Sequence, residues 1–255
     1  MPDSPEPFSG SRPPGARIVS FVQRSGRLGP RLQRVWDAHA ADYLVEVPRG
    51  GPATSIASGY RLDPHALFGR DAPLVVEIGS GRGETIAAAA AERPDVDHLA
   101  CEVYRPGVAR TVARLSQAGT TNVRILQADA VHLLASALPE ASVDELWVFF
   151  PDPWHKARHH KRRLVSPDLA RLVARVLRDG GVWRLATDWP DYADQIAHVL
   201  HEAPDLDGGE VDRFSRRPLT RFESKARDEG RATTDFAVTR RPRAARLSTD
   251  PLAPR

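Results

Sequence analysis

Cysteine, lysine and long apolar runs are all scarce in this sequence of 255 residues. The single cysteine, Cys101, excludes a disulfide framework and a cysteine-based metal site. No run approaches the roughly 20 apolar residues that a membrane span needs, and the first residues, MPDSPEPFSGSRPPG, lack the apolar stretch of a secretory signal. Hydrophobic residues make up 41% and charged residues 27%, which is ordinary for a globular protein. We therefore expect a cytoplasmic α/β domain with extensions and no membrane partner.

Positive charge is concentrated in two clusters, although the net charge is only +3. Between Pro7 and Trp36 there are six arginines and no acidic residue. The second cluster is the nine-residue stretch 155–163, HKARHHKRR, which holds five cations and three histidines. Because guanidinium groups match phosphate oxygens, the two clusters together favour a polyanionic partner. A solvated face is the other interpretation of either cluster alone, above all of the N-terminal one.

The chain divides into a central domain and flanking segments. Residues 1–16 and 241–255 are rich in proline with serine, glycine or arginine, and we expect both to be disordered. Residues 17–60 form a basic extension, and residues 61–240 alternate short apolar runs with helical stretches, which predicts a mostly parallel sheet with helices on both faces. The expected strands are 74–78, 98–103, 123–127, 145–150 and 181–186, and the expected helices include 84–92, 105–117 and one that begins after Ser166.

A glycine-rich turn, Glu77-Ile-Gly79-Ser-Gly81-Arg-Gly83-Glu84, follows the first expected strand. Such glycines allow a sharp turn and bring backbone N–H groups close to a ligand at a helix N-terminus. A dinucleotide fingerprint has its third glycine one residue later, and its pyrophosphate would meet two carboxylates here. Those carboxylates suit a cationic sulfonium instead. The pattern resembles the first motif of Rossmann-like methyltransferases that use S-adenosylmethionine, and a tight strand-to-helix turn is the alternative.

Two more carboxylates stand where the next strands are expected to end. Glu102 can accept hydrogen bonds from the ribose hydroxyls of a nucleoside, and Asp129 can accept one from an adenine amino group. A surface carboxylate is the alternative for Glu102, and a helix N-cap is the alternative for Asp129. Because the carboxyl ends of parallel strands share one edge of the sheet, the combination predicts an S-adenosylmethionine site that includes Glu77, Gly79, Gly81, Glu102 and Asp129.

The segment after the fourth expected strand, FFPDPWHK at residues 149–156, is the most specific feature. Its two prolines restrain the backbone, which places Asp152 and Trp154 at the edge of the sheet. A tryptophan there can stack on a nucleobase, and a buried aspartate can accept hydrogen bonds from the Watson–Crick edge of a guanine. The alternative is a proline-stiffened loop with a core tryptophan.

The stretch FFPDPWHKARHHKRR, with ATDW at 186–189 and TRFE at 220–223, closely resembles the bacterial tRNA (guanine-N7)-methyltransferase family. The resemblance covers roughly residues 17–240 and implies methylation of guanosine 46 in the variable loop of tRNA. It implies that Asp152 lines the cofactor site with Glu77, Glu102 and Asp129, and that Asp152 is catalytic. The implied substrate contacts are Lys156, Asp188, Thr220, Arg221, Phe222 and Glu223, and the implied RNA contacts are Arg158, His159, His160, Lys161, Arg162 and Arg163.

One position departs from the family pattern. Arg221 stands where the family commonly has lysine, and the two cations hydrogen-bond differently, so this contact stays open.

Two other functions stay open at this point. A Rossmann-like methyltransferase acting on an exocyclic amine also has a proline-rich aromatic motif after the fourth strand, but its Asp or Asn precedes both prolines, whereas Asp152 lies between them. A non-catalytic RNA-binding module that kept the fold is the second, and the intact acids at three strand ends argue against it.

We expect a monomer or homodimer that requires no other protein.

A metal site is the remaining question, since His155 and His159 have helical spacing. The surrounding cations repel a metal ion, and no carboxylate or cysteine completes the set, so we expect no metal.

Overall fold

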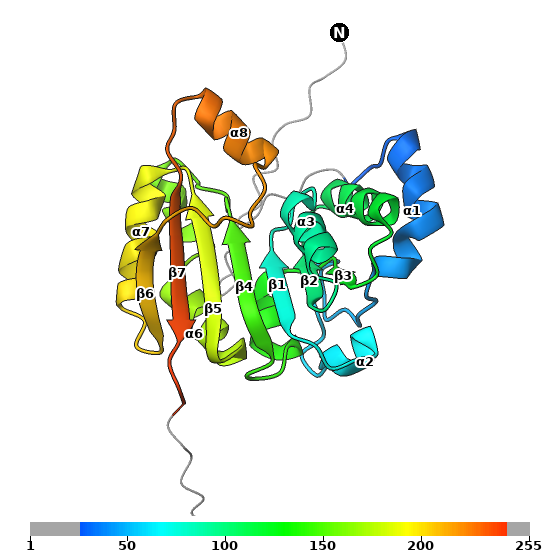
Figure 1. Ribbon diagram of the computed structural model, residues 1–255, viewed down its shortest axis with the longest axis horizontal. Coiled ribbons are helices and arrows are strands. Elements are labelled where there is room, and N and C mark those ends of the chain that lie inside the picture. The colour runs from blue at the N-terminus through cyan, green and yellow to red at the C-terminus, as the bar shows by residue number, and fades with distance from the viewer. Residues whose placement is uncertain (1–25, 244–255) are drawn as a thin grey trace, which may run out of the picture.

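The computed structural model describes residues 26–243, which form one mixed sheet with helices on both faces (Figure 1). Within these residues the sheet has seven strands in the order β3-β2-β1-β4-β5-β7-β6. The strands from β3 to β5 run parallel, and β7 is antiparallel to both of its neighbours. The strands are β1 Leu74–Ile78, β2 Asp97–Cys101, β3 Val123–Leu126, β4 Val143–Phe149, β5 Leu177–Thr187, β6 Leu206–Val211 and β7 Thr234–Arg240. The predicted α/β class with a mostly parallel sheet is confirmed.

Helices cover the two faces of the sheet unequally (Figure 1). In that view α3 and α4 lie in front of β1 to β3 with α1 beside α4, while α6 and α7 lie behind β4 to β6. No helix in the described part of the chain is long and apolar enough to cross a membrane. The helices are α1 Pro30–Tyr43, α2 Pro64–Phe68, α3 Glu84–Glu92, α4 Arg105–Ala118, α5 Ala130–His132, α6 Pro167–Val176, α7 Pro190–His201 and α8 Arg221–Asp228, with a π-helical turn Leu133–Ala137 and a 3-10 helix Ala157–Arg162.

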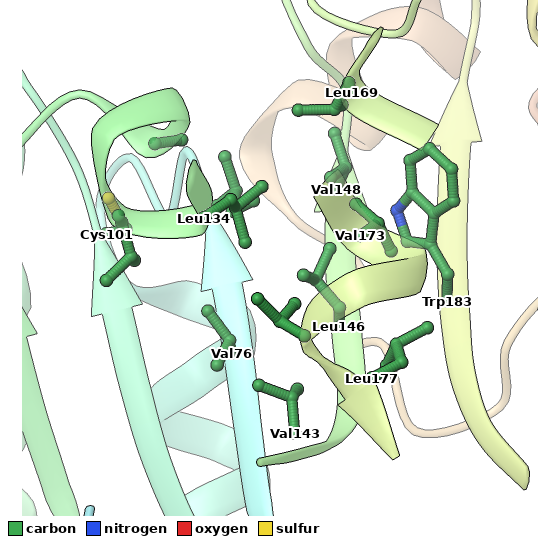
Figure 2. Close-up of a cluster of buried hydrophobic side chains, with 14 of the residues drawn as sticks. Val76, Cys101, Leu134, Val143, Leu146, Val148, Leu169, Val173, Leu177 and Trp183 are labelled. Atoms are coloured by element: carbon green, nitrogen blue, oxygen red, sulfur yellow. The ribbon is translucent and has the colours of Figure 1, made fainter. Parts of the chain in front are cut away.

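The largest hydrophobic cluster of the described residues includes the face of the sheet that α6 covers, and Figure 2 shows part of it. Leu146 and Val148 of β4 pack there with Val173 of α6 and Trp183 of β5. Leu146 and Val173 are fully buried, and burying such a side chain contributes about 1.5–3 kcal/mol. Helix α6 begins as expected, because the Ser166 hydroxyl accepts a hydrogen bond from the Leu169 N–H at 3.2 Å. This packing holds the ends of the parallel strands in place.

Most strands and helices of the parallel half were predicted to within a few residues. The strand 74–78 and the helix 84–92 have the expected bounds, whereas β5 begins at Leu177 rather than at 181. The strands β6 and β7 were not predicted. β6 is mostly exposed and contains Gly208, where an added Cβ would lie 2.3 Å from the Ala237 carbonyl oxygen of β7. Glycine permits this close approach, but it also removes the apolar pattern that marks a strand.

The predicted flanking segments are only partly described. Residues 1–16 lie outside the described residues, as do 17–25 of the predicted extension 17–60. The rest of that extension folds onto the domain, where the Arg105 guanidinium lies 4.6 Å from the Trp36 ring centroid. Of the tail 241–255 only residues 241–243 are described, and the Arg243 guanidinium donates to backbone oxygens of α6 and β5.

Candidate functional site

A cavity of about 280 Å³ opens at the carboxyl ends of the parallel strands. In Figure 1 the arrows of β1, β4 and β5 point upward, toward these ends. The glycine turn after β1 and the segments that follow β2, β3 and β4 line it, and Thr220 and Phe222 at the start of α8 complete its rim. The structure therefore brings the predicted cofactor residues together. They are Glu77, Gly79, Gly81, Glu102, Asp129 and Asp152.

The glycine turn is fixed between β2 and α4. Gly81 has a φ of 57°, and its N–H donates to Glu102 Oε2 at 2.8 Å. Gly83 has a φ of 70° and precedes α3, and a Cβ added there would lie 2.5 Å from Thr111 Cγ2 of α4. Left-handed backbone and this close approach both favour glycine. The turn therefore has a rigid shape beside the cavity.

Glu77 is a buried carboxylate with unused bonding capacity. The residue is 4% exposed, and its Oε2 atom has no hydrogen-bond partner. Burial, followed by the negative charge of Glu102, raises the pKa of Glu77 to about 8. A carboxylate of this kind on a cavity wall is stabilised by a ligand that carries positive charge or N–H and O–H donors. This residue fits the positively charged cofactor predicted from the sequence.

Glu102 and Asp129 both hold the backbone around the cavity. Glu102 accepts N–H bonds from Gly81, Val103 and Tyr104 at 2.7–2.8 Å. Burial raises the pKa of Glu102, and these backbone N–H groups oppose that increase. Asp129 caps α5 by accepting from the Val131 N–H at 2.9 Å, so the helix-cap interpretation of Asp129 is confirmed. The two carboxylates still line the cavity, and their role toward a cofactor stays a prediction.

The loop after β4 has an unusual backbone. Phe150 and Trp154 have φ values of 51° and 48°, and side chains other than glycine rarely keep such values unless neighbouring structure holds them. The Phe150 N–H donates to the Ala186 carbonyl oxygen at 2.8 Å. Asp152 lies between these residues and is exposed at the rim of the cavity. Asp152 is therefore an exposed residue that lines the cavity, and its catalytic role stays a prediction.

The start of α8 also lies at the rim of the cavity. The Thr220 hydroxyl caps α8 by accepting from the Glu223 N–H at 3.2 Å. The Arg221 N–H donates to Glu84 Oε2 at 2.9 Å, which joins the beginning of α8 to the beginning of α3. Phe222 lies on the surface at the same rim. These contacts place the predicted substrate segment 220–223 beside the cavity.

The basic run continues from the Asp152 loop as the 3-10 helix Ala157–Arg162. Lys156, Arg158 and Lys161 are exposed. The Arg162 guanidinium lies 3.8 Å from the Trp154 ring centroid, a cation–π contact that holds one face of the ring. The structure thus offers cations to solvent next to the cavity, while Trp154 already has a stacking partner.

Comparison with known proteins gives the family. The family model described as "Putative methyltransferase" matches residues 71–236. A tRNA (guanine-N(7)-)-methyltransferase of Paenarthrobacter aurescens is 41% identical, covering 94% of this chain and 99% of its own, and one of Nocardioides sp. is 49% identical, covering 88% of both chains. The chain belongs to the tRNA (guanine-N7)-methyltransferase family. The solved structure of the 16S rRNA methyltransferase KamB, with a TM-score of 0.50 and 19% identity over 70% of this chain and 92% of KamB, shows the same fold.

Two predicted contacts need correction in this tRNA (guanine-N7)-methyltransferase chain. The Arg163 side chain is 2% exposed, and its guanidinium pairs with Asp191 at 2.6 Å. The Glu223 carboxylate is also buried, and it pairs with Arg213 at 2.6 Å and with Arg217 at 3.3 Å. Neither side chain is offered to RNA or to a substrate, because each is already enclosed in an ion pair. Both residues instead fix the segments that carry the exposed candidates.

Asp188 has a partner that the sequence did not suggest. Its carboxylate accepts from Arg231 at 2.8 Å, and the Arg231 guanidinium lies 5.8 Å from the Trp189 ring centroid. The two charged residues are 43 positions apart, so only the fold brings them together. A substrate could bind Asp188 only by sharing the Asp188 carboxylate with Arg231.

The three histidines of the basic run face different partners. His155 packs on the Trp189 ring with centroids 4.1 Å apart. His159 contacts the Trp154 ring edge-on, and His160 lies 3.2 Å from the Arg163 guanidinium. The three rings therefore serve separate contacts, and the expectation of no metal stays a prediction.

Proposed function

We propose that this chain transfers a methyl group from S-adenosylmethionine to N7 of guanosine 46 in the variable loop of tRNA. One observation carries the proposal: Glu77, Glu102, Asp129 and Asp152 meet in a single cavity whose rim continues into exposed cations. The acids suit a cationic donor, and the cations suit a polynucleotide. The two relatives that are 41% and 49% identical are tRNA (guanine-N(7)-)-methyltransferases, which agrees with a tRNA guanine as the substrate.

The walls of the cavity hold the cofactor. Glu77, with its unpaired buried oxygen, accepts from the positively charged part. Glu102 and Asp129 accept from the nucleoside, with Gly79 and Gly81 allowing close backbone approach. When bound, S-adenosylmethionine supplies an electrophilic methyl group.

The residues on the reacting side position a guanine and oppose its developing charge. Guanine N7 has a lone pair and no proton, so no side chain needs to act as a general base. The ring becomes positive as N7 gains the methyl group, and a carboxylate beside it stabilises that charge. Asp152 at the rim takes this role. Asp188 shares it when one of its carboxylate oxygens accepts from the guanine while Arg231 keeps its bond to the other. Lys156, Thr220, Arg221 and Phe222 contact the nucleotide from the two sides of the rim.

The basic run binds the tRNA backbone. Arg158 and Lys161 are exposed and His159, His160 and Arg162 are half-buried, and these five form the RNA contact. The buried Arg163 holds the run in place through its ion pair with Asp191. Phosphate contacts release counterions, so affinity for tRNA falls steeply with added salt. A monomer or homodimer without a further protein is the proposed working form.

Methylation of unmodified tRNA by the purified protein tests the proposal. Labelled product digested to nucleosides should contain N7-methylguanosine, and the labelled chain should break at that site after borohydride and aniline. An N-methylated exocyclic amine would leave the chain intact and support the alternative chemistry. No transfer, with no thermal stabilisation by S-adenosylhomocysteine, would leave only an RNA-binding module.

The role of Asp152 has its own test. Asp152→Asn should lower the single-turnover rate by about 10²–10³ while leaving tRNA affinity nearly unchanged. A rate equal to that of the parent would remove Asp152 from the mechanism.

A further inference from the structure

A fully buried arginine, Arg217, lies beside the cavity without lining it. Arg217 is 1% exposed, and its guanidinium pairs with Asp235 at the start of β7 and with Glu223 in the first turn of α8. The nitrogen–oxygen distances are 2.9 Å to Asp235 Oδ2 and 3.3 Å to each Glu223 oxygen. The guanidinium thus has two carboxylates around it, as a buried cation requires. It connects the sheet to α8.

The same guanidinium contacts the loop after β4. Its Cζ atom lies 5.1 Å from the Phe149 ring centroid and 5.3 Å from the Phe150 ring centroid. Phe150 is one of the residues with positive φ, so its conformation depends on packing of this kind. Only Pro151 separates Phe150 from Asp152. Arg217 therefore supports the segment that carries the proposed catalytic carboxylate.

Through Glu223, Arg217 also holds the start of α8. The Glu223 N–H donates to the Thr220 hydroxyl. The Arg221 N–H, between them in the sequence, donates to the carboxylate of Glu84 at the start of α3. Thr220 and Phe222 line the cavity. Holding the Glu223 carboxylate therefore fixes where these two residues stand relative to Asp152.

We propose that Arg217 is a positioning residue for methyl transfer, which holds the Asp152 loop and the start of α8 in a fixed position relative to each other at the rim of the cavity. The inference rests on the proposed function. Buried ion pairs add little net stability compared with apolar packing, but a planar guanidinium with bonds in fixed directions defines geometry on each side of it. Arg217 contacts both segments, so its guanidinium can define their relative position.

The variant Arg217→Lys tests the proposal. Lysine keeps the charge but loses the planar fork, so it cannot bind both carboxylates and pack on two rings in the same way. Misplacement by about 1 Å can cost about 100-fold in rate. We expect kcat to fall about 100-fold and the Kd for S-adenosylhomocysteine to rise several-fold, whereas the Kd for tRNA stays within about twofold of the parent value.

Arg240→Lys is the matched control. Arg240 is also buried on β7, donates to the Ala174 carbonyl oxygen at 2.9 Å and pairs with Asp205 at 3.4 Å. It stands at the other end of the strand from Asp235. Its loss should lower the melting temperature without changing kcat or ligand affinity per folded molecule.

A third variant decides the matter if Arg217→Lys melts below the assay temperature. Arg213→Met removes the second ion pair on Glu223 from a side chain that is 40% exposed, so the fold should survive. It should show the same pattern in weaker form. The proposal is overturned if the kcat and the Kd for S-adenosylhomocysteine of the folded variant match those of Arg240→Lys. A parent protein that makes no N7-methylguanosine would instead refute the proposed function.

Discussion

Replacing Glu77 by glutamine changes the electrostatics of the cavity with almost no change in shape. Burial and the nearby Glu102 charge raise the Glu77 pKa from 4.5 to about 8, and an increase of this size corresponds to about 5 kcal/mol between the two protonation states. Because the folded-state pKa is above the unfolded one, the folded protein binds this proton more tightly. The resulting stabilisation is fully present below pH 4.5 and is lost as the pH rises to about 8.

Glutamine carries no such proton. As the pH rises from 4.5 to 9, the free energy of unfolding of Glu77→Gln should therefore increase relative to that of the parent. The increase should be a few kcal/mol, with about 5 kcal/mol as the upper bound. The buried His98, whose pKa is lowered to about 4 mainly by burial, titrates in both proteins and cancels in the difference. Urea denaturation at four or five pH values measures this difference.

The same substitution should weaken cofactor binding, although it stabilises the fold. A positively charged ligand lowers the pKa of a neighbouring carboxylate, so the parent should release a fraction of a proton on binding S-adenosylmethionine at pH 7. Glu77→Gln should release less and bind more weakly. Calorimetry in two buffers of different ionisation enthalpy measures the released proton. Equal pH dependence of stability in the two proteins, with equal proton release, would refute the assignment of a buried, electrostatically active Glu77.

Two further changes test the glycine turn and the basic run. Gly83→Ala should destabilise the fold by about 1–3 kcal/mol, because φ is 70° and the new Cβ would meet Thr111 at 2.5 Å; thermal unfolding measures this, and a loss near zero would contradict the close approach. The double variant Arg158→Ala/Lys161→Ala should raise the Kd for tRNA. It should also lower the slope of log Kd against the logarithm of the salt concentration by about two. Arg171→Ala on α6, an exposed arginine outside this run, is the control, and an unchanged slope in the double variant would make the run a solvated face.

The parallel half of the fold could be predicted from the sequence because its strands are buried on both faces. The five residues of β1 are all buried, and they read as one apolar run around Glu77. β6 escaped prediction for a different reason. β6 pairs at the exposed end of the sheet and contains two consecutive glycines, Gly208 and Gly209, so its strand conformation comes from pairing with β7 rather than from its own pattern.

The site shows the same division. The acids at the strand ends could be predicted to converge, since parallel strands deliver their carboxyl ends to one edge. The burial of Arg163 and Glu223 could not, because it depends on Asp191, Arg213 and Arg217, which belong to other segments. A basic run in the sequence looks uniformly available to phosphate. Only the fold separates Arg163, which anchors the run, from neighbours that reach solvent.

Two tRNA transcripts that differ by one atom at guanosine 46 test the central claim most directly. The first carries guanine and the second carries 7-deazaguanine, in which carbon replaces the nitrogen that would accept the methyl group. With labelled S-adenosylmethionine, we predict transfer to the first transcript and none to the second, with equal affinity of the protein for both. Equal transfer to the two transcripts would show that the methyl group goes to another atom and would contradict the account.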